Sequence, residues 1–132
     1  MNSILSPKEL DFIHNNECCR FATTSDSYPH VVPVCYIYLA GIFYISTDYN
    51  TKKYKNILKN AHVSLVIDIY NPGSHNGLFI LGNASIIDKG PLYRRLYSLY
   101  YSKFEWIKKD PWEGDDSPFI EVMPISKTSW GL

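Results

Sequence analysis

Two lysines, Lys52 and Lys53, stand where a helix is expected to begin, which is the least favourable place on a helix for positive charge. Apolar residues recur at helical spacing in the segment after Asn50, and these are Tyr54, Ile57, Leu58 and Ala61. The first backbone N–H groups of a helix have no intrahelical acceptor and form a site for anions. The lysine pair therefore indicates a phosphate site, and a solvated helix face remains the alternative interpretation.

Hydroxyl and guanidinium donors accompany the lysines. Ser46 and Thr47 end the strand expected before the helix, and Thr51 is expected at its cap, so each can donate to the same phosphate. Arg20 begins the segment RFATT and joins this group if that segment lies beside YIST. An arginine suits the role because its planar fork engages two oxygens of one phosphate.

No other pattern in the chain indicates catalytic chemistry. The four histidines are dispersed without metal-ligand spacing, and the chain lacks the GxSxG and HExxH motifs. The three cysteines, without CxxC spacing, are expected to be reduced and partly buried: Cys18, Cys19 and Cys35. We therefore expect no metal site and no catalytic side chain.

The apolar pattern predicts the order α-β-β-β-α-β-β-α-β. A first helix is expected over about residues 6–16, with Ser6 as its cap and Glu9 completing a capping box. Strands are expected at 18–25, 30–40, 41–48, 62–70, 78–87 and 119–132, with a hairpin at Leu39–Gly41, a loop over 71–77 and a second long helix over 92–109. The strands are short and mostly hairpin-linked, so we expect a six-stranded, largely antiparallel sheet that closes into a barrel with flanking helices.

Length and composition fit one soluble domain over residues 1–132. The chain is 45% hydrophobic and 20% charged, and 13 basic residues balance 13 acidic ones. This balance argues against a nucleic-acid partner, which usually requires a basic excess. We expect a cytoplasmic protein without a membrane segment, because the chain has no 18-residue apolar run and no signal-peptide pattern. The near-zero net charge also suits an oligomer.

Several segments recur in a familiar order along residues 17–132. They are RFATT, PHVVPV, FYIST, TKKYKNILKN, VSLVID, a following GNA strand and the terminal SWGL. In order and spacing the chain resembles the pyridoxamine 5'-phosphate oxidase-related family of FMN-binding split β-barrel proteins. The resemblance implies a homodimer with two FMN molecules at the subunit interface and an oxidoreductase that acts on a small organic substrate.

The resemblance also implies which residues hold FMN. Matched by position, the phosphate and ribityl contacts are Arg20, Ser46, Thr47, Lys52 and Lys53, Ala22 and Thr23 lie along the flavin, and Pro33 and Val34 form the wall beside its ring. Asn76 falls near a position that reaches the flavin from the partner subunit, and Trp130 lies against the cofactor or the dimer seam. The chain stops at Leu132, without the basic C-terminal cluster of the true oxidases, so vitamin B6 is not the expected substrate. Use of the deazaflavin F420 and a non-catalytic flavin carrier stay open as alternatives.

Overall fold

The computed structural model describes residues 4–26, 28–112 and 116–132. In chain order the elements are α1 (Pro7–His14), β1 (Cys18–Thr23), β2 (His30–Cys35), β3 (Ile37–Leu39), β4 (Ile42–Ser46), α2 (Lys52–Lys59), β5 (His62–Asn71), β6 (Ser74–Ile87), α3 (Pro91–Lys103), α4 (Glu105–Lys109) and β7 (Phe119–Trp130). None of the described helices is long and apolar enough to cross a membrane.

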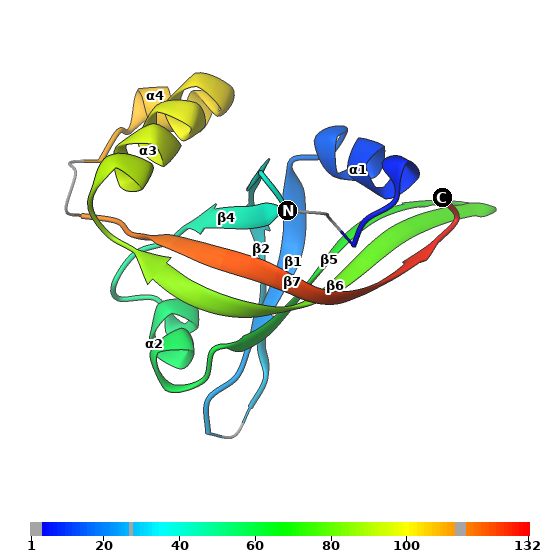
Figure 1. The fold of residues 1–132 in the computed structure, drawn as a ribbon, viewed down its shortest axis with the longest axis horizontal. Helices are drawn as coiled ribbons and strands as arrows, with labels where there is room; N and C mark the ends of the chain where they lie inside the picture. Colours follow the sequence, from blue (N-terminus) through cyan, green and yellow to red (C-terminus); the bar gives the residue numbers. More distant parts are fainter. Residues whose placement is uncertain (1–3, 27, 113–115) are drawn as a thin grey trace.

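The strands form one antiparallel sheet in the order β2-β1-β5-β6-β7-β4-β3. Its two edge strands, β2 and β3, are separated in the sequence by Tyr36 alone. The chain therefore passes directly from one edge of the sheet to the other, and the sheet curls into a split barrel (Figure 1). This confirms the predicted antiparallel barrel, with the expected strand over 30–40 divided in two.

Tyr36 divides that strand because its side chain binds the end of α1. The ring is buried, and its hydroxyl donates to the backbone carbonyls of Ile13 and Asn16 at the end of α1. The last carbonyls of a helix otherwise have no intrahelical donor. The bond thus ties the first helix to the junction between the sheet edges, a contact that strand periodicity cannot reveal.

Helices α1 and α2 cover opposite ends of the barrel (Figure 1). The first begins as expected, because the Ser6 hydroxyl accepts from the Glu9 N–H while the Glu9 carboxylate accepts from the Ser6 N–H. Phe12 and Ile13 from α1 and Ile57 from α2 belong to the apolar core inside the barrel. The helix ends at His14, two residues before the expected limit.

A second core lies on the outside of the sheet, under α3 and α4. Its fully buried members include Leu96, Tyr100, Ile107 and Phe119. The Tyr100 hydroxyl donates to the carbonyls of Tyr44 and Cys35, at 2.7 and 3.1 Å. The single helix expected over 92–109 is broken at Phe104, whose backbone is extended and whose ring is buried in this core.

Two turns set the hairpins of the sheet. The predicted hairpin at Leu39–Gly41 is confirmed, with positive φ at Ala40 (51°) and Gly41 (89°). The loop predicted over 71–77 is wrong, because β5 continues to Asn71 and β6 begins at Ser74. Pro72 and Gly73 alone make this turn, with Gly73 at φ 81°, a conformation that glycine adopts without strain. Polar residues flank the turn on both sides, so the apolar pattern did not predict that the strands extend to it.

Candidate functional site

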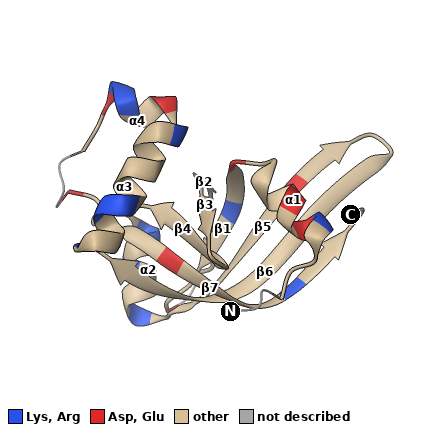
Figure 2. Cartoon of the chain, turned by 45° about the horizontal axis from the view of Figure 1, so that its top comes forward, with Lys and Arg blue, Asp and Glu red and all other residues tan. Residues whose placement is uncertain are grey.

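The helix with the lysine pair begins where the sequence predicts. Lys52 and Lys53 are the first two residues of α2, Thr51 is its cap, and its first turn has no acidic residue. The Thr51 hydroxyl accepts from the Tyr54 N–H at 3.3 Å. Figure 2 shows only basic coloured segments along α2, in keeping with its four lysines and no carboxylate. Two cations therefore add to the positive end of this helix dipole.

The end of β4 brings its hydroxyl groups to the same place. A small pocket of about 160 Å³ is lined by Ser46, Thr47, Asp48, Lys53, Trp106, Trp112 and Ser117. The hydroxyls of Thr47 and Thr51 lie 2.9 Å apart, and the Thr47 N–H donates to the Pro118 carbonyl at 3.1 Å. The predicted group of Ser46, Thr47, Thr51, Lys52 and Lys53 is thus gathered at one helix end.

The Lys53 amine is half-buried, and burial lowers its pKa, while the nearby Asp48 carboxylate raises it again in part. Asp48 also accepts a hydrogen bond from the Ser117 hydroxyl at 2.7 Å. An amine with a lowered pKa is stabilised in its charged form by a further anion. The donor set fits a phosphate, and among the described residues that line the pocket Asp48 is the one acidic group.

Arg20 does not join this group within one chain. Strand β1 pairs with β2 and β5, whereas β4, which carries the YIST segment, pairs with β3 and β7. The Arg20 side chain is exposed and its Nε lies 3.2 Å from an Asp68 oxygen. The pairing under which Arg20 would reach the helix end is therefore absent.

The other residues expected along the flavin lie on different faces of β1 and β2. Ala22 and Pro33 alternate with the buried positions and face outward, while Val34 packs against the barrel core. Thr23 is buried, and its hydroxyl accepts from the Asn56 side chain of α2 at 3.0 Å. Thr23 therefore holds the middle of α2 against β1.

Asn76 and Trp130 meet at the far end of β6 and β7. The Asn76 side-chain amide donates to the Gly131 carbonyl. The Trp130 ring lies over Gly77, where any Cβ would overlap it. The Trp130 indole nitrogen is buried and has no hydrogen-bond acceptor among the described residues. An unpaired buried donor costs about 1–3 kcal/mol.

Replacing Gly77 with alanine is expected to displace the Trp130 indole, because the new methyl group occupies the space of its six-membered ring. In a background of Trp106→Phe and Trp112→Phe, the remaining tryptophan fluorescence should shift to longer wavelength and become more accessible to iodide. An emission spectrum unchanged by Gly77→Ala would contradict this placement of the ring.

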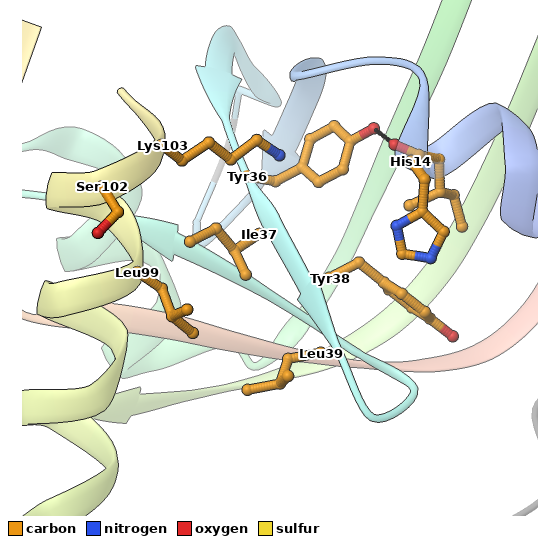
Figure 3. Close-up of a pocket in the computed structure, with 9 residues that line it drawn as sticks. His14, Tyr36, Ile37, Tyr38, Leu39, Leu99, Ser102 and Lys103 are labelled. Atoms are coloured by element: carbon orange, nitrogen blue, oxygen red, sulfur yellow. Dashed lines mark hydrogen bonds between the residues drawn. The ribbon is translucent and has the colours of Figure 1, made fainter. Parts of the chain in front are cut away.

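A separate pocket of about 340 Å³ lies between α1, β3 and α3 (Figure 3). Ile37, Leu39 and Leu99 supply apolar walls, and the Lys103 amine lies 5.8 Å from the centre of the Tyr36 ring. It contains none of the site residues predicted from the sequence.

Sequence reasoning missed part of the pocket beside α2. Asp48 directly follows Thr47 and could have been included, whereas Ser117 is 69 residues further along the chain and gives no local signal. Among the described residues, no group of three or more His, Cys, Asp or Glu side chains is placed to hold a metal ion.

Comparisons with known proteins agree on the fold. Residues 5–126 match the family model described as pyridoxamine 5'-phosphate oxidase. No curated protein sequence matches the chain. Similar solved structures are a Listeria innocua protein provisionally assigned as a pyridoxamine 5'-phosphate oxidase (17% identity, 95% and 97% of the two chains covered, TM-score 0.78), the Vibrio cholerae heme storage protein HutZ (14%, 96% and 94%, 0.80) and an FAD-binding protein from Mesorhizobium loti (20%, 95% and 94%, 0.77).

Proposed function

The chain belongs to the pyridoxamine 5'-phosphate oxidase family, and on that premise we propose that it is a flavoprotein that binds FMN and oxidises or reduces a small organic substrate. The observation that carries the proposal is the lysine pair in the first turn of α2, without a carboxylate in that turn. A bound dianion offsets the repulsion between the lysines and the helix dipole.

The residues at this helix end have distinct tasks. Lys52 and Lys53 supply charge to the phosphate, and the Thr47 and Ser46 hydroxyls at the end of β4 supply neutral donors. Thr51 fixes the start of the helix through its bond to the Tyr54 N–H. Bound FMN supplies the hydride or electron chemistry, so the chain needs to anchor and orient it rather than provide an acid or base.

We further propose that two copies of the chain complete the site. Asn76 and Trp130 lie at the far end of the sheet from α2, so one chain does not bring all the predicted contacts together (Figure 1). The unpaired indole nitrogen of Trp130 calls for an acceptor from outside the chain. Large apolar side chains are also exposed on β2, β6 and β7: Val31 at 63%, Leu81 at 45% and Ile125 at 57%. A second copy of the chain would cover such side chains.

Mass spectrometry of the small molecule released on denaturation tests the cofactor assignment. We expect FMN, with an absorbance band near 450 nm (roughly, from flavin chemistry). Release of the deazaflavin F420, FAD or haem would contradict the assignment; the solved relatives include an FAD-binding protein and a heme storage protein. A preparation without cofactor is titrated with FMN, and failure to bind it would contradict the proposal equally.

Reduction by a nicotinamide separates an enzyme from a carrier. For the FMN-loaded protein we expect NADH or NADPH to bleach the flavin band and air to restore it. A flavin that stays oxidised with both nicotinamides, and also with a panel of small organic reductants, would favour the carrier. The oligomeric state is measured on the same sample by light scattering, where a monomer would contradict the shared site.

A further inference from the structure

Cys18 and Cys35 face each other across neighbouring strands. They are direct partners in the β1–β2 ladder, and their sulfur atoms lie 3.4 Å apart. Cys18 is exposed and Cys35 is half-buried, so a reagent in solution can reach the pair through Cys18. Neither cysteine is among the predicted flavin contacts.

The backbone around the pair already has a geometry suited to a disulfide. The Tyr36 N–H donates to the Glu17 carbonyl at 3.0 Å, a bond that flanks the Cys18–Cys35 pair. In an antiparallel ladder such a pair is therefore non-hydrogen-bonded, and its Cα atoms lie about 4.5 Å apart. That separation falls within the range that disulfides span, about 4.4–6.8 Å. Closing the bond requires the two side chains to turn, not the strands to move.

The surroundings give the two thiols different accessibility. A pocket of about 340 Å³ opens beside Cys18 and is also lined by Arg20, Pro33 and Asp68, which leaves room for a small molecule. Burial, followed by the hydrogen bond with Cys18, raises the pKa of Cys35 to about 11. The thiolate is the attacking species, so Cys18 is the point of entry and Cys35 reacts second.

Cys19 is the natural comparison, because it is adjacent in sequence and faces the opposite way. Its side chain is buried in the barrel core, and burial raises its pKa to about 12. A buried, protonated thiol exchanges slowly with reagents in solution. Cys19 should therefore stay reduced under conditions that oxidise the other two cysteines.

We propose that Cys18 and Cys35 form a reversible disulfide by exchange with a small-molecule disulfide such as oxidised glutathione. The Cys18 thiolate attacks one sulfur of glutathione disulfide, which breaks the S–S bond and releases one glutathione thiolate. The Cys35 thiol passes its proton to a thiolate or to water, and its sulfur then attacks the Cys18 sulfur and releases the second glutathione. Two protein thiols are oxidised and one glutathione disulfide is reduced, and excess glutathione reverses the process.

The test is incubation of the native protein with oxidised glutathione, alkylation of free thiols under unfolding conditions, and mass analysis of the intact chain. We expect one alkylated cysteine, the loss of two hydrogen atoms and no glutathione adduct. The unfolding temperature should rise by about 5–10 °C, because the bond closes the loop between Cys18 and Cys35 and so restricts the unfolded chain. Dithiothreitol should return the unfolding temperature to its original value. Three alkylated cysteines, a lasting adduct on the wild-type chain or an unchanged unfolding temperature would overturn the proposal.

Three variants identify the sulfurs involved. In Cys35→Ser the second step is blocked, so a glutathione adduct should accumulate on Cys18. Cys18→Ser should remove both the adduct and the disulfide, whereas Cys19→Ala should leave disulfide formation intact. Circular dichroism checks that each variant is folded. Loss of the disulfide in Cys19→Ala would mean that Cys19 takes part in the bond. Absence of the adduct in Cys35→Ser would mean that Cys18 does not react first. Either result would overturn the Cys18–Cys35 pairing.

Discussion

Replacing Glu9 with glutamine is expected to lower the free energy of unfolding at pH 7 by about 3 kcal/mol. Glu9 is 2% exposed, and its carboxylate accepts from the Lys127 amine at 2.7 and 2.9 Å and from the Ser129 hydroxyl at 2.6 Å. Burial alone would raise the pKa of Glu9, but these bonds and the one from the Ser6 N–H lower it from 4.5 to about 2. Each unit of pKa corresponds to about 1.4 kcal/mol.

The direction of the shift fixes the pH dependence. Because the pKa is lower in the folded chain, the stabilisation is complete above about pH 4.5 and is lost as the pH falls towards 2. Urea unfolding between pH 7 and 3 should therefore show the wild-type protein approaching Glu9→Gln in stability. Glu105→Gln is the matched control, because its ion pair with Lys108 is exposed and contributes less than about 1 kcal/mol. A constant difference between wild type and Glu9→Gln at all pH values would contradict the assignment.

The double variant Lys52→Ala, Lys53→Ala is expected to bind FMN at least about 100-fold more weakly than the wild-type protein. Two hydrogen bonds assisted by charge, each contributing about 1.5–3 kcal/mol, would be lost. Without FMN the same variant should be as stable as wild type or slightly more so, because it removes repulsion at the positive end of α2. Quenching of flavin fluorescence measures the affinity, and urea unfolding measures the stability.

The same helix provides the control for that experiment. Lys55 and Lys59 are exposed on α2, beyond its first two positions, and Lys59 forms a surface ion pair with Asp26. The variant Lys55→Ala, Lys59→Ala removes the same charge from the same helix and should change FMN affinity by less than about threefold, since exposed charges are screened. Equal losses of FMN affinity in the two double variants would mean that net charge alone causes the effect. That result would contradict a specific phosphate site.

Local signals in the sequence were sufficient for much of the fold. The capping box of Ser6 and Glu9, the cap at Thr51 and the turn at Ala40–Gly41 are determined by residues close together in the chain. Three features depend on distant contacts and escaped prediction. Tyr36 breaks a strand to bind the end of α1, Phe104 breaks a helix to fill the outer core, and polar residues beside Pro72 conceal a long hairpin.

In the candidate site, too, some contacts could be predicted from nearby residues and others depend on distant parts of the chain. The group from Ser46 to Lys53 lies within eight consecutive residues, so a strand followed by a helix was enough to place it. Arg20 depended on the order of strands, which the apolar pattern does not determine. Ser117 reaches Asp48 from a distant part of the chain, and Trp130 was placed by the absence of a side chain at Gly77. These contacts required the folded structure.

If α2 binds the phosphate of a flavin nucleotide, the protein should distinguish FMN from riboflavin. Riboflavin has the same ring and ribityl chain without the phosphate. We expect the wild-type protein to bind FMN at least about 100-fold more tightly than riboflavin, because charge-assisted bonds to the phosphate dianion are absent for riboflavin. The double variant Lys52→Ala, Lys53→Ala should largely abolish this preference. Equal affinity of the wild-type protein for FMN and riboflavin would contradict the claim.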